Sequence, residues 1–172
     1  MIHHKILVAI DNSEQASKVF QEALDIAQKS GSHLMLFHCI VNTHFDKDPI
    51  FIGTIGDVDM YSNFRKKQQK LLLDEIEKVQ GWLQSYCQQA NLRKVSAEFK
   101  YEFGRASKEI CNAAKSWRAD LIVLGRRGHK GLTEMLLGSV SNYVVHYAPC
   151  SVLIVQKHLP VAEKKSDMAT TA

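Results

Sequence analysis

The feature that most constrains the fold is a set of five short apolar runs, separated by longer stretches with helical spacing. A continuous run of Val, Ile and Leu that is too short for a helix is typical of a strand covered on both faces. The third run alternates polar and apolar residues but also reads as a strand. The five runs are KILVAI (5–10), HLMLFHCI (33–40), VSAEFKYEF (95–103), DLIVLG (120–125) and SVLIV (151–155).

The stretches between these runs have the apolar period of amphipathic helices. In the first, Asn12 or Ser13 is expected to cap the helix and Gly31 to end it. Three more helices are expected. The second is long, the third ends near Trp117, and the fourth is short, running from Gly138 to about Tyr147 and stopping before Pro149. Apolar residues mark the buried sides of the first three helices: Ala16, Val19, Phe20, Ala23, Ile26, Ala27; Leu72, Ile76, Val79, Leu83, Tyr86, Cys87, Ala90; and Ile110, Ala114, Trp117.

Strands alternating with helices predict an α/β fold with an open parallel sheet and helices on both faces. A length of 172 residues fits one domain, which we place at residues 1–158. Residues 42–61 carry no clear period and contain Pro49, Gly53 and Gly56, so we expect a long variable loop, either a functional flap or disordered. The polar residues 159–172 have no core-forming pattern and are expected to be a disordered tail.

Composition narrows the class of protein. A net charge of +4 suits an anionic ligand but lacks the dense basic stripe of a nucleic-acid binder, which disfavours that class. The apolar run before Asp11 is too short for a signal peptide or a membrane span. The four scattered cysteines are typical of buried thiols in a reducing compartment, so we expect a cytoplasmic protein.

Open α/β sheets bind ligands beyond the carboxyl ends of their strands, at the point where the strand order reverses. The residues alone allow two orders, 2-1-3-4-5 and 3-2-1-4-5. Both place the first strand, which ends at Asp11, beside the reversal. Only the second also brings Gly125, at the end of the fourth strand, to the same crevice.

The stretch GRRGHKGLTEMLLGSVS (125–141) contains what a phosphate group needs. Gly125 and Gly128 permit close approach of the backbone, while Gly138 and Ser139 open a helix whose free N–H groups attract an anion. Hydroxyls and nearby cations would add donors and charge: Ser139, Ser141, Arg127 and Lys130. The alternative is a mobile glycine-rich connector. Neither GxxxxGK[ST] nor a GxGxxG after the first strand occurs, which excludes a Walker-type P-loop and disfavours a dinucleotide site.

The spacing Gly125-x-x-Gly128-(nine residues)-Gly138-Ser139 resembles the ATP-binding motif of the universal stress protein family. The similarity extends from KILVAID through ADLIVLG to APCSVLIV, across nearly all of residues 5–155. This resemblance implies the order 3-2-1-4-5 and a homodimer joined through Ser151–Val155. It also implies an adenine nucleotide as ligand: ATP with Mg²⁺, or AMP or ADP.

Carried over residue by residue, the resemblance implies a full set of nucleotide contacts. Asp11 would lie beside the adenosine, and the backbone at Cys39 and Ile40 against the adenine. The ribose and phosphates would lie along Gly125, Arg127 and Gly128, and the triphosphate pocket would be closed by Gly138, Ser139, Val140 and Ser141. Arg126 departs from the small residue that many ATP-binding members carry.

These features predict a nucleotide-binding, dimeric stress-response module with slow turnover at most. Hydrolysis needs a positioned water and metal ligands, and Asp11 and Glu134, the acidic residues near the motif, have no partner at an obvious catalytic spacing. Two alternatives stay open: a genuine ATPase or nucleotide-transfer enzyme, and a dimeric scaffold that ignores nucleotide. Nucleotide that co-purifies with the protein would separate these classes.

Overall fold

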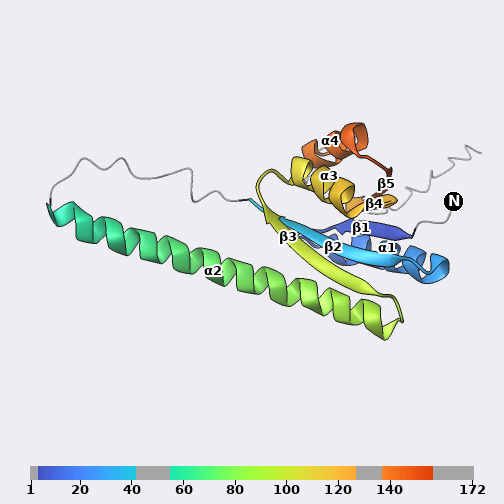
Figure 1. The fold of residues 1–172 in the computed structure, drawn as a ribbon, viewed down its shortest axis with the longest axis horizontal. Coiled ribbons are helices and arrows are strands. Elements are labelled where there is room, and N and C mark those ends of the chain that lie inside the picture. The colour runs from blue at the N-terminus through green and yellow to red at the C-terminus, as the bar shows by residue number, and fades with distance from the viewer. Residues whose placement is uncertain (1–3, 42–54, 127–136, 157–172) are drawn as a thin grey trace, which may run out of the picture.

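The computed structural model describes residues 4–41, 55–126 and 137–156, and within these ranges it describes residues 55–61 by their backbone alone. Strands and helices alternate along the chain (Figure 1). Their order is β1 (Lys5–Ala9), α1 (Ala16–Ser30), β2 (His33–Ile40), α2 (Ile55–Leu92), β3 (Ala97–Phe103), α3 (Ala106–Trp117), β4 (Leu121–Gly125), α4 (Ser139–Tyr147) and β5 (Ser151–Val155).

All five strands pair in parallel in the order β3-β2-β1-β4-β5, which confirms the α/β fold class and the second of the two strand orders. The central strand β1 pairs with β2 on one side and with β4 on the other. In register, Ala9 lies opposite both Phe37 and Leu124. The carboxyl ends of β1 and β4 therefore meet where the strand order reverses.

Alternate side chains of the strands point to opposite faces of the sheet and pack into two separate hydrophobic cores. Ile6 and Val8 point to the face covered by α1 and α2, and Leu7 points to the face covered by α3 and α4. Figure 1 shows α3 and α4 on one side of the sheet and α2 on the other. These three β1 side chains are fully buried, and each such burial contributes about 1.5–3 kcal/mol to stability.

The first helix follows its predicted period but not its predicted cap. Its residue Gly31 adopts the left-handed conformation, with φ of 68°, and ends the helix as expected. The N-cap is Gln15, not Asn12 or Ser13, and its side chain makes no capping hydrogen bond. The reason lies upstream: the Asp11 carboxylate accepts a hydrogen bond from the Ser13 N–H, and this local turn delays the start of the helix.

The long helix α2 has the buried side that its period predicts, with Val79, Leu83, Cys87 and Ala90 in the core. Its start differs from expectation. The segment predicted as a loop over 42–61 is helical from Ile55 onward, while residues 42–54 and the predicted tail, 159–172, lie outside the described residues. The apolar period reports burial rather than helicity, and residues 62–75 of this helix contain no buried residue.

Candidate functional site

The candidate site lies at the carboxyl ends of β1 and β4. One residue beyond β1, the Ile10 N–H still donates to the Phe37 carbonyl at 3.0 Å. The strand order reverses here: from β1 the chain continues to β2 and β3 on one side of the sheet, while β4 and β5 lie on the other side of β1. Ligands of open α/β sheets bind at this kind of reversal.

Asp11 is half-buried at the end of β1. Its Oδ1 accepts from the Ser13 N–H at 3.2 Å, and the next turn is closed by the Ala16 N–H donating to the Ser13 carbonyl at 3.1 Å. A carboxylate has two oxygens with several lone pairs, so it can accept more than one hydrogen bond. The position predicted for a ligand contact is thus fixed by a turn rather than by a helix cap.

His38 supports the same end of β1. Its Nδ1 lies 2.9 Å from the Ile10 carbonyl oxygen, and since a carbonyl can only accept, Nδ1 carries the proton. The ring also meets Trp82 of α2 edge-on, with the ring centroids 5.1 Å apart. The link from His38 to Ile10, next to Asp11, has no signal in the sequence.

Cys39 and Ile40 end the neighbouring strand β2, and both are buried. The Cys39 thiol points to the α3 side and donates to the Gly104 carbonyl at 3.3 Å, while the Ile40 carbonyl accepts from the Gly104 N–H at 3.2 Å. Burial, followed by the nearby carboxylates of Glu109 and Glu102, raises the pKa of Cys39 to about 11. The thiol is therefore protonated at neutral pH and packs as a small apolar group.

Gly125 ends β4 beside β1. A Cβ added there would lie 3.1 Å from Val19 Cγ2 and 3.4 Å from Gln15 Oε1, so the close packing of α1 already disfavours a side chain at this position. The next residue, Arg126, has a half-buried side chain and donates its backbone N–H to the Val155 carbonyl at 3.1 Å. Arg127 and Gly128, as well as Lys130 and Glu134, lie outside the described residues.

The glycine-serine pair opens α4 as predicted. Gly138 is the N-cap in an extended conformation, with φ of −60° and ψ of 156°, and Ser139, Val140 and Ser141 form the first turn. The first backbone bond of the helix runs from the Asn142 N–H to the Gly138 carbonyl at 2.9 Å. The N–H groups of the first turn precede that bond, so they are the ones that a helix presents to an anion.

Ser141 is the exception to the predicted set of hydroxyl donors. It is only 2% exposed, and its Oγ donates to the Gly138 carbonyl at 3.0 Å. The hydroxyl proton is thus committed inside α4, while Ser139 is exposed at the helix start. Of the two serines, Ser139 is the one placed to donate to a ligand.

An acidic metal centre is not formed by the part of the chain that the structure describes, which has no group of three His, Cys, Asp or Glu side chains suited to a metal ion. Mg²⁺ bound in proteins commonly takes most of its ligands from nucleotide phosphates, water and one or two protein groups. Asp11 and Ser139 have the oxygen chemistry for that minor share. The described helices also include none that is long and apolar enough to cross a bilayer.

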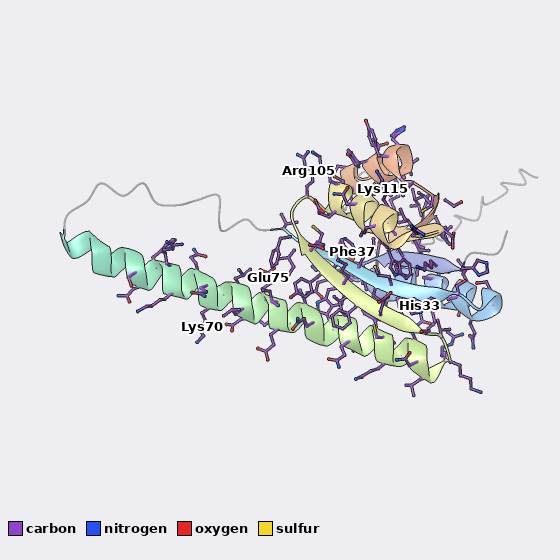
Figure 2. The ribbon with its side chains drawn as sticks, in the orientation of Figure 1. His33, Phe37, Lys70, Glu75, Arg105 and Lys115 are labelled. Atoms are coloured by element: carbon purple, nitrogen blue, oxygen red, sulfur yellow. The ribbon has the colours of Figure 1, made fainter. Side chains whose placement is uncertain are left out.

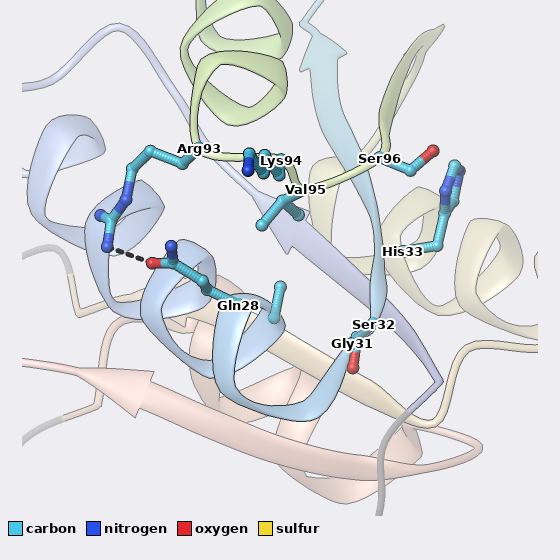
Figure 3. Close-up of a pocket in the computed structure, with 9 residues that line it drawn as sticks. Gln28, Gly31, Ser32, His33, Arg93, Lys94, Val95 and Ser96 are labelled. Carbon is cyan, nitrogen blue, oxygen red and sulfur yellow. Dashed lines mark hydrogen bonds between the residues drawn. The ribbon is translucent and has the colours of Figure 1, made fainter.

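A depression of about 400 Å³ lies at the opposite end of the sheet, where α1 ends and β2 begins (Figure 3). Its most polar side chain, Arg93, forms an ion pair with Asp25 at 3.0 Å and donates to Gln28, the bond drawn in Figure 3. This guanidinium is engaged within the protein, and the depression lies at the amino ends of the strands. The chemistry predicted from the sequence is at the other end.

Comparison with known proteins identifies the chain's relatives. A profile of the universal stress protein family matches residues 3–156. The chain is 44% identical over 160 residues to universal stress protein Sll1388 of Synechocystis, covering 91% of this chain and 99% of the relative. It is 32% identical over 157 residues to universal stress protein YxiE of Bacillus subtilis, covering 89% and 99%.

Solved structures agree in fold. Universal stress protein UspA from Lactobacillus plantarum superposes with a TM-score of 0.68 at 25% identity, covering 90% of this chain and 99% of that one. A universal stress protein in complex with cAMP gives a TM-score of 0.64 at 21% identity, covering 90% and 98%. One from Archaeoglobus fulgidus in complex with dAMP gives 0.60 at 18%, also covering 90% and 98%. The sequence matches and the shared strand order show that this chain belongs to the universal stress protein family.

Proposed function

We propose that this protein binds an adenine nucleotide, ATP with Mg²⁺ or else AMP or ADP, and acts as a cytoplasmic stress-response module rather than as an efficient enzyme. The observation that carries the proposal is the start of α4, where the N-cap Gly138 has no side chain to cap the first-turn N–H groups of Ser139, Val140 and Ser141, the groups that would bind a phosphate. Structural neighbours in complex with cAMP and with dAMP support an adenine nucleotide as the ligand class.

In this proposal different residues of the chain contact different parts of the nucleotide. Asp11, at the end of β1, accepts from a ribose hydroxyl, and the backbone at Cys39 and Ile40 lies against the adenine. The ribose and phosphates run along Gly125, Arg127 and Gly128 toward the first turn of α4, where Ser139 donates its hydroxyl. Mg²⁺ is held mainly by the phosphates.

The test is ATP binding by a Gly138→Val variant, measured by titration calorimetry in the presence of Mg²⁺. The extended backbone at this N-cap is open to any residue, so the variant should fold, losing only the modest stability that a poor N-cap costs, on the order of 1 kcal/mol. The valine side chain blocks close approach to the first-turn N–H groups, and we expect binding to be lost.

Lys115→Ala is the matched control for that titration. Lys115 is exposed in the last turn of α3, toward the amino ends of the strands and away from the strand reversal, and Figure 2 labels it. Binding should match the parent protein. If Gly138→Val also binds ATP like the parent, the phosphates do not lie at α4.

Turnover is tested on the same protein by following ADP release from ATP. Asp11, the described carboxylate nearest the reversal, is held by the Ser13 N–H, and we propose that it positions ribose rather than activates water. We therefore expect turnover slower than nucleotide exchange. Release of ADP at an enzyme-like rate of about 1–10³ per second would favour the ATPase alternative.

We further propose that the protein is a homodimer joined through β5. This strand lies at the edge of the sheet, and its residues Val152, Leu153 and Ile154 are only half-buried within one chain. Next to it, α4 exposes Val145 by 44% and Tyr147 by 65%. An apolar edge with apolar neighbours is a surface that soluble proteins normally cover, and a two-fold axis would pair β5 with its own copy.

A further inference from the structure

One part of the fold has no counterpart in the nucleotide proposal: the first half of α2. Figure 1 shows this helix continuing well past the end of the sheet. Among the side chains of α2 that the structure describes, the buried ones lie between Val79 and Ala90, and residues 62–75, called the arm below, contain none. A helical segment of this length is marginal in water without tertiary packing, so the arm lacks the contacts that usually stabilise a helix.

The arm carries an apolar stripe. At 100° per residue, Phe64, Gln68 and Leu71 fall within 60° of one another, on the side where Trp82 and Tyr86 later meet the body. Phe64 is 40% exposed and Leu71 48% exposed. Between them, the side-chain oxygen of Gln68 is buried yet has no hydrogen-bond partner among the residues that the structure describes. Both features point to a missing partner along this stripe.

The charges of the arm identify that partner. Basic residues fill its first part (Arg65, Lys66, Lys67 and Lys70), and acidic residues fill the end and the next turn (Asp74, Glu75 and Glu77). Figure 2 shows Lys70 and Glu75 on the projecting part of α2. A second arm laid antiparallel places each basic block against the other's acidic block, whereas a parallel arm would place like charges together.

We propose that the arm is an interface with a second copy of this chain, in which two arms pair antiparallel about a two-fold axis near residue 70. In this register Leu71 of each copy packs beside Leu71 of the other at the axis, and Phe64 lies against the partner's turn near residue 77. Lys67 of one copy faces the partner's Asp74. The partner also supplies polar groups to Gln68. The pairing is isologous, as closed dimers require.

This contact is separate from the proposed β5 contact. β5 and β3 are opposite edges of the sheet, and α2 packs under β3 and β2. A chain with both two-fold contacts assembles into a closed tetramer or an open fibre, so the arm doubles the native mass at least. The proposal does not depend on nucleotide binding, and its test can fail without affecting that function.

The first experiment compares native masses by light scattering at micromolar concentration. The variant Phe64→Asp/Leu71→Asp should lower the mass at least twofold relative to the parent. The control is Leu73→Asp, which changes a leucine that is 57% exposed and lies 200° around the helix from Leu71. The control should keep the parental mass. None of these residues is buried in the single chain, so all three proteins should fold.

The second experiment tests the antiparallel direction. Lys67→Glu and Asp74→Lys should each weaken self-association, by roughly tenfold for two exposed ion pairs replaced by repulsion. The double variant Lys67→Glu/Asp74→Lys should recover the parental association. Residues seven apart on one helix lie about 10 Å apart along the axis and do not pair, so recovery reports a contact between copies.

Two outcomes would overturn the proposal. A parental mass for Phe64→Asp/Leu71→Asp means that the arm does not hold copies together, and another protein or a segment of the same chain covers the stripe. Unchanged association in both single charge variants rules out the antiparallel register, since parallel arms would not place Lys67 near Asp74.

Discussion

At Ser141 the helix was predicted correctly, but the role of the side-chain hydroxyl was not. Serine at the start of a helix commonly offers its hydroxyl to a ligand, but here the hydroxyl donates to the carbonyl of Gly138, three residues earlier, and is buried. The bond tightens the first turn and leaves the backbone N–H of Ser141 as its contribution to the site. At this position the anion binding that we propose rests on the backbone of the helix start and not on the side chain.

The two arginines after β4 should differ in their effect on ATP. Charge-assisted contacts to phosphate contribute roughly 1.5–3 kcal/mol, so Arg127→Ala should weaken ATP binding by about tenfold or more. Arg126 belongs to the end of the sheet through its backbone bond to Val155, and Arg126→Ala should have the smaller effect. Calorimetry on both variants decides the assignment, and a larger loss for Arg126→Ala would reverse it.

At the scale of elements, β1, β2 and β4 were predictable because burial on both faces leaves a continuous apolar run, whereas the exposed edge strand β3 was predicted from its alternating pattern. The helix starts were less so. α1 begins at Ala16 because Asp11 and Ser13 form a turn, a choice between two hydrogen bonds of similar strength. The start of α2 at Ile55, within a predicted loop, was missed because the sequence there shows no apolar period.

The contact between α1 and β4 gives a test of element packing. Gly125→Ala places a methyl group 3.1 Å from Val19 Cγ2, and since Val19 is buried and β-branched it cannot move aside freely. We expect a loss of about 1–3 kcal/mol in the free energy of unfolding, measured with urea. Combining it with Val19→Ala should cost less than the sum of the two single changes, because the removed methyl groups make room.

Gly81→Ala serves as the control for that measurement. A Cβ at Gly81 meets nothing within 4 Å, and the residue lies inside α2. Alanine is the better helix former by roughly 0.5–1 kcal/mol, so this change should stabilise the protein. An unchanged free energy of unfolding for Gly125→Ala would show that α1 shifts to accommodate the added methyl group and would contradict this prediction.

For the whole molecule, the reversal of strand order was the step that the residues alone could not determine. Both orders satisfy the same apolar runs, and the family resemblance selected the one that the structure has. Once that order is known, the placement of Asp11, Gly125 and Gly138 near the strand reversal can be predicted from their positions in the sequence. The link from His38 to Ile10 does not, because it joins side chain to backbone across two strands and depends on register.

The β5 contact is tested at this scale by native mass. Ile154→Glu puts a charge next to the middle of the edge strand and should halve the mass or yield insoluble protein. Leu153→Val, which keeps an apolar β-former, is the control and should retain the parental mass. If the arms also pair, Ile154→Glu remains a dimer and becomes a monomer only with Phe64→Asp/Leu71→Asp. A monomeric parent protein would contradict both contacts.

The length of α2 has a mechanical consequence. Its 38 residues span about 57 Å, while the contacts with β2 and β3 hold only the last third of that rod. A tilt of about 5° at those contacts would carry the first residue through an arc of roughly 4 Å. The strand β2 that seats the helix also ends at Cys39 and Ile40. Small shifts at that end of β2 would thus produce much larger displacements at the start of α2, which would alter its contacts with a neighbouring molecule.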